Sequence, residues 1–207
     1  FTWSKLRKYL IDDETDPNSS NDFGKNIIPN MLNAGEKLMA YRFAGYWKDV
    51  GTINSLWDAN MDLLAGSSSG LDMYDDSWPI YARTPIKPPH VTGPAAVISH
   101  SMVTGGSQVD GSVANSVLFN SVTVEQGADI QYSILMPGAT VKEGAKVYYS
   151  IVAENATVET GATVGAAPDG SDSWGIAVVA GGVTVGKNAT VLPNAMIRED
   201  VKGGEQA

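Results

Sequence analysis

The feature that most constrains the fold is a seventeen-residue repeat that runs through residues 115–165. Its three copies read NSVLFNSVTVEQGADIQ, YSILMPGATVKEGAKVY and YSIVAENATVETGATVG. Aliphatic side chains fall at the same positions of each copy, and one such set is Val124, Val141 and Val158. Self-similarity at a fixed period is the sequence signature of stacked structural units. The repeat therefore predicts a solenoid in which each copy forms one coil.

The spacing within each copy indicates strands. Aliphatic residues mostly lie two, four or six positions apart, which is the period of a strand and not of a helix. Three units of nearly six residues make one copy, so we expect a triangular coil with large aliphatics inside and glycines where the backbone bends. Each coil would bury its aliphatics only against a stacked neighbour. An antiparallel sandwich is the alternative, which three matching copies disfavour.

Composition narrows the class of protein and of partner. With 207 residues, 43% hydrophobic and 18% charged, the chain suits one large or two small globular domains. The net charge of −9 and the scattered basic residues argue against binding to nucleic acid or to an anionic membrane surface. The absence of cysteine excludes disulfides and thiolate zinc sites and agrees with a cytoplasmic location. No apolar run approaches the roughly 20 residues of a transmembrane helix.

The chain before the GSSSG stretch predicts helices and one strand. Residues 3–10 and 23–35 have apolar residues at helical spacing, and residues 38–46 alternate as a strand does. A further helix is predicted to follow the N-cap Thr52. The residues expected on the inner face of that helix are Leu56, Ala59, Asn60 and Leu63. This mixture indicates part of an α/β domain.

A linker is predicted between this region and the coils. GSSSG and the prolines that follow it favour extended chain over residues 66–93. The coils are expected to occupy residues 94–207, because valines recur at six-residue spacing from Val97 onward. Residues 166–182 interrupt the repeat with Gly and Asp and predict a loop, after which VTVGKNATVLPNAMI forms a last coil.

Asp49 is the strongest candidate for chemistry. It lies in YWKDVGT, between a large aromatic and a glycine turn, where a strand is expected to end. Ligands gather at strand ends in α/β sheets, and a carboxylate there could bind Mg²⁺. The alternative is a turn aspartate that accepts hydrogen bonds from nearby backbone N–H groups. Taken by itself, a single carboxylate favours the turn interpretation.

Several longer stretches carry a family resemblance. DFGKNIIPNM, YWKDVGTINSLWDANMDLL, LDMYDDSWPIY and SMVTGGSQVDGSVANSVLF together resemble the bacterial glucose-1-phosphate adenylyltransferases, the ADP-glucose pyrophosphorylases of glycogen synthesis. W-x-D-x-G-T alone is common to sugar nucleotidyltransferases, whereas the combination is specific and covers nearly the whole chain. The resemblance implies the C-terminal part of a nucleotidyltransferase catalytic domain at residues 1–65, then the linker, then a left-handed parallel β-helix of hexapeptide type.

The resemblance also implies an activity and a set of site residues. The family transfers adenylyl from ATP to glucose 1-phosphate and releases pyrophosphate, with Mg²⁺ as its cofactor. Carried over one residue at a time, Asp49 is a catalytic residue and metal ligand, and Trp47, Asp22 and Phe23 line the sugar-phosphate site. Such a transfer depends on positioning and on charge neutralisation. The alternatives are that Trp47 is a core residue and that Asp22 caps a helix.

Other elements of the family do not occur in this sequence. The glycine-rich G-G-x-G-x-R-L loop, a second metal-binding aspartate and a sugar-binding lysine belong to the N-terminal half of the family. Phe1 would lie just after the family's S-M-G-[IV]-Y segment. The chain is therefore expected to begin inside the catalytic domain and to be inactive by itself.

Two other functions stay open at this point. Hexapeptide coils also form acyltransferases with a catalytic histidine, for which only His90 and His100 are available. A non-catalytic regulatory or assembly subunit of the same family is the other possibility, and the intact WKDVGT argues against it.

The coils are expected to serve assembly and regulation. A β-helix exposes backbone edges at its ends and flat faces along its sides, and both can pair with another chain. The resemblance implies self-association or pairing with a related subunit, and it leaves open a homotetramer, a mixed assembly and the identity of the effector. The outward aromatics expected in the contact are Phe119, Tyr132, Tyr148 and Tyr149.

Overall fold

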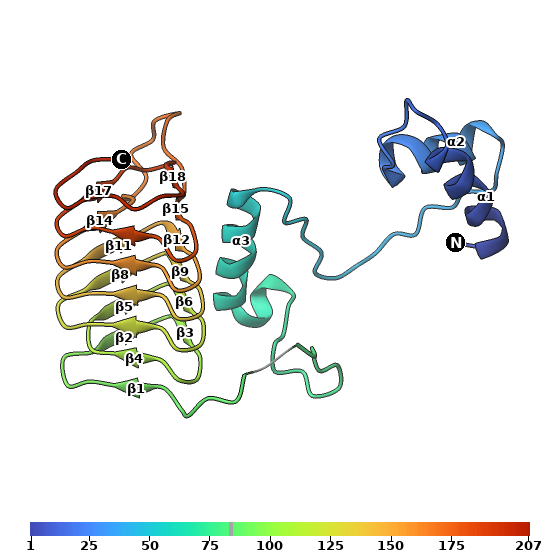
Figure 1. Cartoon of the computed structure of the whole chain (residues 1–207). Coiled ribbons are helices and arrows are strands. Elements are labelled where there is room, and N and C mark those ends of the chain that lie inside the picture. Colours follow the sequence, from blue (N-terminus) through green and yellow to red (C-terminus); the bar gives the residue numbers. More distant parts are fainter. Residues whose placement is uncertain (83–84) are drawn as a thin grey trace. The chain divides into compact units, whose positions relative to one another are not determined.

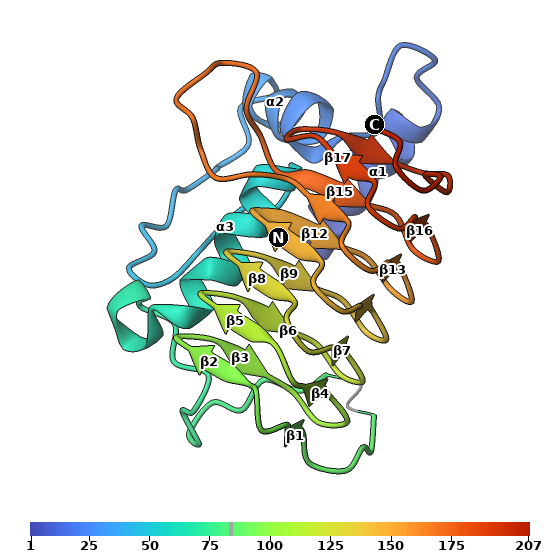
Figure 2. The ribbon, with the colours of Figure 1, turned by 90° about the vertical axis from the view of Figure 1, so that its left-hand side faces the viewer.

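The repeat folds into triangular coils that stack on one another (Figures 1 and 2). In the computed structural model, which describes residues 1–82 and 85–207, each coil contributes one strand to each of three six-stranded parallel sheets. The first sheet contains β1 (Val91–Thr92), β4 (Gln108–Val109), β7 (Thr123–Val124), β10 (Thr140–Val141), β13 (Thr157–Val158) and β16 (Thr184–Val185). The second contains β2 (Val97–Ser99), β5 (Ser112–Ala114), β8 (Asp129–Gln131), β11 (Lys146–Tyr148), β14 (Thr163–Val164) and β17 (Thr190–Val191). The third contains β3 (Met102–Val103), β6 (Val117–Leu118), β9 (Ile134–Leu135), β12 (Ser150–Val152), β15 (Ala177–Val179) and β18 (Met196–Ile197).

Neighbouring coils pair in the register that the repeat predicts. β10 pairs with β7 and β13, so that Val141 lies opposite Val124 and Val158. These three side chains are at most 1% exposed and belong to one continuous apolar core inside the coils. The prediction of equivalent, buried valines in stacked coils is therefore confirmed.

One corner of the coils is held by a ladder of buried serines, Ser116, Ser133 and Ser150. The backbone N–H of Ser133 donates to Oγ of Ser116 at 3.1 Å, and that of Ser150 donates to Oγ of Ser133 at 3.2 Å. The hydroxyls of Ser133 and Ser150 donate in turn to backbone carbonyls. The ladder thus pairs polar groups that would otherwise be buried without partners. Gly165 packs against the last serine, since an added Cβ there would lie 2.3 Å from Oγ of Ser150.

The residues that interrupt the repeat form a loop between β14 and β15, which we call the insertion loop; it is drawn in orange in Figure 2. The chain leaves the coil after β14 and returns at β15, where Val178 pairs with Ile151. The indole Nε1 of Trp174 donates to the backbone carbonyl of Ala166 at 2.9 Å, so this hydrogen bond bridges the two ends of the loop. The loop is shorter than the sequence predicts, since Ala177–Val179 rejoin the third sheet.

α3 (Ile53–Leu64) lies along the third sheet (Figures 1 and 2). A capping box closes its first turn: Oγ1 of Thr52 accepts from the Ser55 N–H, and Oγ of Ser55 accepts from the Thr52 N–H. The apolar contact between helix and sheet joins Ile53, Leu56, Trp57 and Met61 to Ile134, Ile151 and Ile176. Of the inner face expected from the sequence, only Leu56 takes part in this contact.

Two aromatics that were expected to face another chain pack within this chain instead. Tyr132 and Tyr149 stack with 4.7 Å between their ring centroids, and Tyr149 stacks on Trp57 at 5.9 Å. The expectation of an intermolecular role for these two tyrosines is corrected by this packing. Phe119 is 36% exposed, and Tyr148 lies on the second sheet, where its hydroxyl donates to Asp129 at 2.7 Å.

Residues 1–44 form a separate, smaller unit. It contains α1 (Trp3–Glu14), a π-helical turn (Phe23–Ile27) and α2 (Ile28–Asn33). Its core consists of the buried Leu6, Ile27 and Met31, against which Tyr9, Leu10 and Leu38 pack. The helical spacing in the sequence correctly indicated both helical segments, and α1 extends four residues beyond the predicted end at residue 10.

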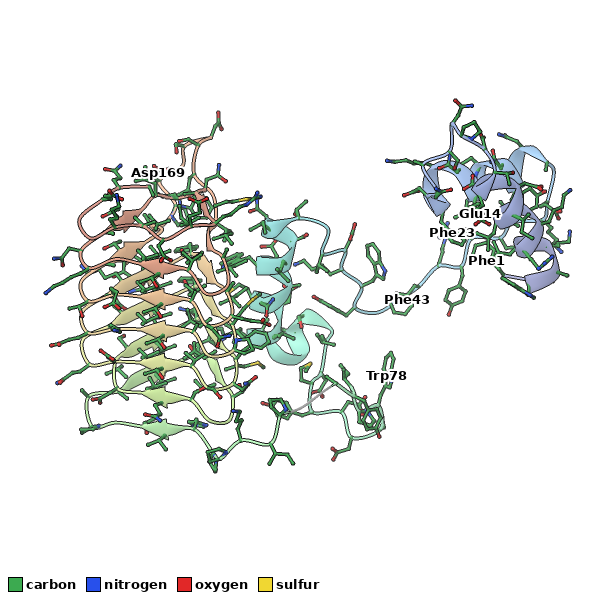
Figure 3. The ribbon with its side chains drawn as sticks, in the orientation of Figure 1. Phe1, Glu14, Phe23, Phe43, Trp78 and Asp169 are labelled. Carbon is green, nitrogen blue, oxygen red and sulfur yellow. The ribbon has the colours of Figure 1, made fainter. Side chains whose placement is uncertain are left out.

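Residues 38–46 do not form the predicted strand. Within the described ranges, all strands belong to the three sheets of the coils. A lone strand leaves its backbone N–H and C=O groups without partners, so alternation of side chains alone does not create one. Met39, Tyr41 and Phe43 are accordingly 80, 88 and 59% exposed (Phe43 is labelled in Figure 3).

The chain divides into its two compact units between Ala44 and Gly45, whereas the sequence predicts that the catalytic-domain segment ends near residue 65. The cause is α3, which packs on the coils and so joins the second unit. No helix in residues 1–82 and 85–207 is long and apolar enough to cross a membrane.

Candidate functional site

The segment that enters α3 carries Trp47 and Asp49. On either side of Trp47, the hydroxyl of Tyr46 donates to Oδ2 of Asp62 at 3.0 Å, and Nζ of Lys48 donates to the same oxygen at 2.8 Å. Successive side chains of an extended segment point to opposite sides. Trp47 and Asp49 alternate with the two anchored residues, and both are exposed, Trp47 to 77%. The segment therefore presents an indole and a carboxylate to solvent while its other side is held on α3.

The side chains that form this anchor, Tyr46, Lys48 and Asp62, stabilise one another's ordinary protonation states. The hydrogen bond from Lys48 lowers the pKa of Asp62, and the same bond raises the pKa of Lys48. Burial, followed by the hydrogen bond to Asp62, raises the pKa of Tyr46. This anchor was not predicted from the sequence, although the alternation of Tyr46 and Lys48 with Trp47 and Asp49 is a signal that could have indicated it.

Asp49 supplies one oxygen-donor side chain. Within residues 1–82 and 85–207, no three His, Cys, Asp or Glu side chains are grouped closely enough to hold a metal ion. Carboxylate oxygen is nonetheless the donor that hard divalent cations prefer, and Mg²⁺ is often held by one or two carboxylates together with substrate phosphates. Asp49 thus fits the part of one protein ligand in such a site.

Asp22 and Phe23 lie in the first unit, whereas Trp47 and Asp49 lie in the second. Oδ1 of Asp22 accepts a hydrogen bond from the backbone N–H of Lys25 at 2.8 Å, so Asp22 caps the π-helical turn. Phe23 is 44% exposed, and its ring centroid lies 5.7 Å from that of Phe1. Asp22 therefore has the capping contact that was its alternative interpretation, and one face of Phe23 stays open to solvent.

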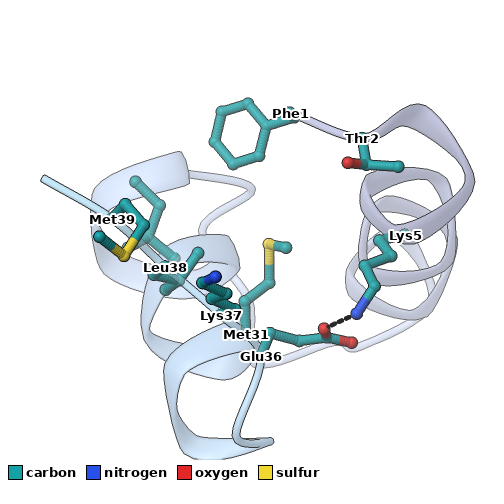
Figure 4. A pocket seen from close by; sticks show the side chains of 9 residues that line it. Phe1, Thr2, Lys5, Met31, Glu36, Lys37, Leu38 and Met39 are labelled. Atoms are coloured by element: carbon teal, nitrogen blue, oxygen red, sulfur yellow. Dashed lines mark hydrogen bonds and ion pairs between the residues drawn. The ribbon is translucent and has the colours of Figure 1, made fainter. Parts of the chain in front are cut away.

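The first unit also contains a hollow of about 760 Å³ (Figure 4). Its apolar lining consists of Phe1, Ile28, Met31, Leu38 and Met39. Its polar lining includes the ion pair between Lys5 and Glu36, and the hydrogen bond from Lys5 lowers the pKa of Glu36. Asp22 and Phe23 do not line this hollow. The lining thus combines an apolar surface with one ion pair, and none of its residues is a site residue predicted from the sequence.

The two histidines lie outside any such site. His90 is exposed in the linker region, and His100 is exposed at a corner of the coils. Nδ1 of His100 lies 2.8 Å from Oδ1 of Asn115, the residue at the equivalent corner of the next coil. Neither histidine lines the hollows described in the structure. This arrangement gives no support to an acyltransferase.

Two family models match the chain. A model described as "Nucleotidyl transferase" matches residues 1–66, which include Asp22, Phe23, Trp47 and Asp49. A model described as "GlmU-like, C-terminal hexapeptide" matches residues 89–186. The second match agrees with the stacked parallel coils and confirms the expected left-handed β-helix of hexapeptide type.

Curated relatives carry one and the same name. A glucose-1-phosphate adenylyltransferase of Clostridium perfringens (strain SM101 / Type A) is 55% identical over 131 residues, which is 63% of this chain and 34% of the relative. The protein of that name from Desulforamulus reducens is 50% identical over 133 residues, 64% of this chain and 33% of the relative. That of Bacillus cereus is 50% identical over 128 residues, 62% of this chain and 34% of the relative.

The chain spans about a third of the length of these relatives. A nucleotidyl transferase segment followed by hexapeptide coils is the order in which the two family models match. The chain is thus homologous to the C-terminal portion of the glucose-1-phosphate adenylyltransferases.

Proposed function

We propose that this protein takes part in the transfer of adenylyl from ATP to glucose 1-phosphate, which yields ADP-glucose and pyrophosphate for glycogen synthesis. The observation that carries the proposal is the nucleotidyl transferase match over residues 1–66, together with the name that the relatives share. The exposed Trp47 and Asp49, held on α3 by their neighbours, agree with it because a site that takes a sugar phosphate and a nucleotide must be open to solvent.

Asp49 is proposed to hold the catalytic Mg²⁺. Bound magnesium would supply neutralisation of phosphate charge, which is the main requirement of phosphoryl and nucleotidyl transfer. The contribution of the chain itself is to keep the Asp49 carboxylate on a fixed backbone, between the Lys48 anchor and the capping box at Thr52. Because the carboxylate is exposed, a metal ion can reach it from solvent.

The remaining site residues are proposed to bind the sugar phosphate. The exposed indole of Trp47 offers a flat apolar face of the kind on which sugar rings can lie. Phe23 offers a second, partly exposed ring, and Asp22 fixes the turn that presents it.

The coils are proposed to mediate self-association or pairing with a related subunit. Hexapeptide coils have flat sides and open ends, and both are suited to contacts between chains. Tyr149 stacks on Trp57 of α3 and Tyr132 stacks on Tyr149, so the partly exposed Phe119 is the aromatic proposed for this contact. Sedimentation of the chain at tens of micromolar, a rough concentration for contacts of moderate affinity, tests this part: a monomer would contradict it.

The activity is tested in the protein expressed from its complete reading frame, by release of pyrophosphate from ATP, glucose 1-phosphate and Mg²⁺. We expect activity with this pair of substrates and expect Asp49→Asn to lower turnover by on the order of 10²-fold or more. Circular dichroism of the variant should stay unchanged, because the Asp49 side chain is exposed. Absence of pyrophosphate release in the unchanged protein would overturn the proposed activity, and near-normal turnover of Asp49→Asn would overturn the role of Asp49.

A further inference from the structure

The segment that carries Trp47 and Asp49 is mechanically part of the coil unit. Tyr46 and Lys48 bind Asp62 in the last part of α3, and the capping box at Thr52 fixes the turn between the segment and the helix. A displacement of α3 would therefore displace Asp49 with it. The position of α3, in turn, depends on what holds the helix against the third sheet.

Four aromatic rings meet where α3 contacts the coils. Trp57 of α3 donates its indole Nε1 hydrogen to the backbone carbonyl of Tyr132 at 2.7 Å and stacks on Tyr149 at 5.9 Å with 27° between the ring planes. Tyr149 stacks on Tyr132 at 4.7 Å, and Trp174 of the insertion loop meets Tyr149 edge-on at 5.6 Å. The cluster, called here the aromatic stack, thus joins α3, two successive coils and the insertion loop.

The backbone at the two tyrosines argues that their rings are there for this contact. Tyr132 and Tyr149 occupy corner positions with φ of 48° and 46°. The equivalent corners of the preceding coils are Asn115 and His100, with φ of 49° and 43°. The left-handed region is unfavourable for a bulky residue, and asparagine adopts it most readily after glycine. Asparagine would therefore suit the corner itself, whereas the tyrosine rings add the stacking of Tyr149 on Trp57 and of Tyr132 on Tyr149.

We propose that the aromatic stack of Trp57, Tyr132, Tyr149 and Trp174 is a positioning device that sets the place of Trp47 and Asp49 for the reaction. The inference rests on the proposed function, and it assigns to the coils a part in catalysis besides assembly. None of the four rings needs to touch the substrate. They act by holding α3, and α3 carries the Asp62 anchor of the site segment.

The test compares variants of Tyr149. Tyr149→Asn removes the ring and keeps a residue that suits the left-handed corner, whereas Tyr149→Phe keeps the ring. Tyr148→Asn is the matched control, since it removes a tyrosine from the adjacent position, on the second sheet, whose hydroxyl contacts Asp129 instead of α3. If Tyr149→Asn fails to fold, Trp57→Leu removes the same contact from the helix side with a good helix former.

The first readout is amide hydrogen exchange of this chain. In Tyr149→Asn we expect faster exchange over α3 and residues 46–52, with the inner strands of the coils still protected. Tyr149→Phe and Tyr148→Asn should exchange over α3 as the unchanged chain does. Unchanged exchange over α3 in Tyr149→Asn would overturn the proposal, because the stack would then not hold the helix.

The second readout is kinetic and uses the protein expressed from the complete reading frame. In folded Tyr149→Asn we expect a higher Mg²⁺ concentration at half-saturation and a turnover lower by on the order of 10-fold to 10²-fold, because misplacing a catalytic group by about 1 Å has an effect of that size. Tyr149→Phe keeps the ring, so its turnover and its Mg²⁺ dependence should match those of the unchanged protein. A variant that melts at lower temperature but keeps normal turnover and Mg²⁺ dependence would show a purely structural contact and overturn the proposal. Should the unchanged protein prove inactive with ATP and glucose 1-phosphate, the proposed function and this catalytic role fail together, and hydrogen exchange alone decides whether the stack holds the segment.

Discussion

The two units of the chain bury their apolar side chains in different ways. In the coils, successive turns add aliphatic residues to one continuous core, which the three six-stranded sheets enclose. In residues 1–44, the buried apolar side chains are Leu6, Ile27 and Met31, while large apolar groups such as Trp3 and Leu32 are 64 and 61% exposed. Units near 40 residues rarely bury enough surface to be stable by themselves. We infer that cooperative stability resides in the coils and that the first unit unfolds more easily.

The residues proposed for catalysis and for substrate binding follow the same division. Asp22 and Phe23 lie in the weakly packed unit, whereas Trp47 and Asp49 lie on a segment that α3 fastens to the strongly packed one. Residues that are neighbours in the sequence can therefore pack with different units of the fold. The nucleotidyl transferase match runs through residue 66, yet α3 at its end packs with the hexapeptide coils.

The largest effect on stability should come from the core of the coils. Leu135 is fully buried in the third sheet, so Leu135→Ala should lower the free energy of unfolding by about 2–5 kcal/mol, through lost burial and the cavity that is left. Leu6→Ala in the first unit is the matched change. It should leave the main urea transition, followed by circular dichroism, unchanged. An equal shift of that transition by both variants would mean that the two units share one cooperative core.

A smaller loss is expected from the serine ladder. Ser133→Ala removes the acceptor of the Ser150 N–H within a fully buried corner, which should cost about 1–3 kcal/mol in the free energy of unfolding. Ser171→Ala in the exposed insertion loop should change it by less than about 0.5 kcal/mol. Urea denaturation of both variants measures the difference. If they prove equal, hydrogen bonds of the corner do not support the coils.

Alanine substitutions at two glycines with left-handed backbone conformation should distinguish the cost of backbone strain from the cost of steric overlap. Gly144 has φ of 66° and open space around an added Cβ, so Gly144→Ala should cost only the backbone penalty of about 1–2 kcal/mol. Gly138 has φ of 73°, and its Cβ would lie 2.3 Å from Oδ1 of Asn155. Gly138→Ala should therefore be the more destabilising of the two in thermal unfolding. The reverse order would show that Asn155 moves away at little cost.

The smallest effect should come from the anchor of the site segment. The folded pKa of Asp62 is lowered by Lys48, so its stabilising contribution is present above the pKa of the unfolded carboxyl and is lost as pH falls through the folded pKa. The folded pKa of Lys48 is raised, so its contribution is lost only as pH rises through that value. The pair is partly exposed and should contribute less than about 1 kcal/mol. The difference in exchange rate over residues 46–52 between Asp62→Asn and the unchanged chain should vanish in acid, and a difference that persists there would contradict the ionic origin.

The repeat was sufficient to predict the coils, because register and burial follow directly from the period. The packing of α3 was not predictable in the same way. Ile134 and Ile151 are outward residues of the third sheet, and strand alternation marks them as exposed without indicating what covers them. The alternation in residues 38–46 was misleading for a related reason, since a strand exists only with a partner. Asp49 was identified by its motif. The alternation of Tyr46 and Lys48 could have indicated anchored side chains, but the fold was needed to identify their partner, Asp62.

The central claim, that the Asp49 segment belongs mechanically to the coils, is tested most directly by hydrogen exchange of this chain at increasing urea concentration. Three regions would be followed: residues 1–44, residues 46–64 and the inner strands of the coils. The account predicts that residues 1–44 lose protection first and that the amides of α3 lose theirs together with the coils, over the same range of urea. Loss of protection in α3 together with residues 1–44, while the coils stay protected, would contradict the claim.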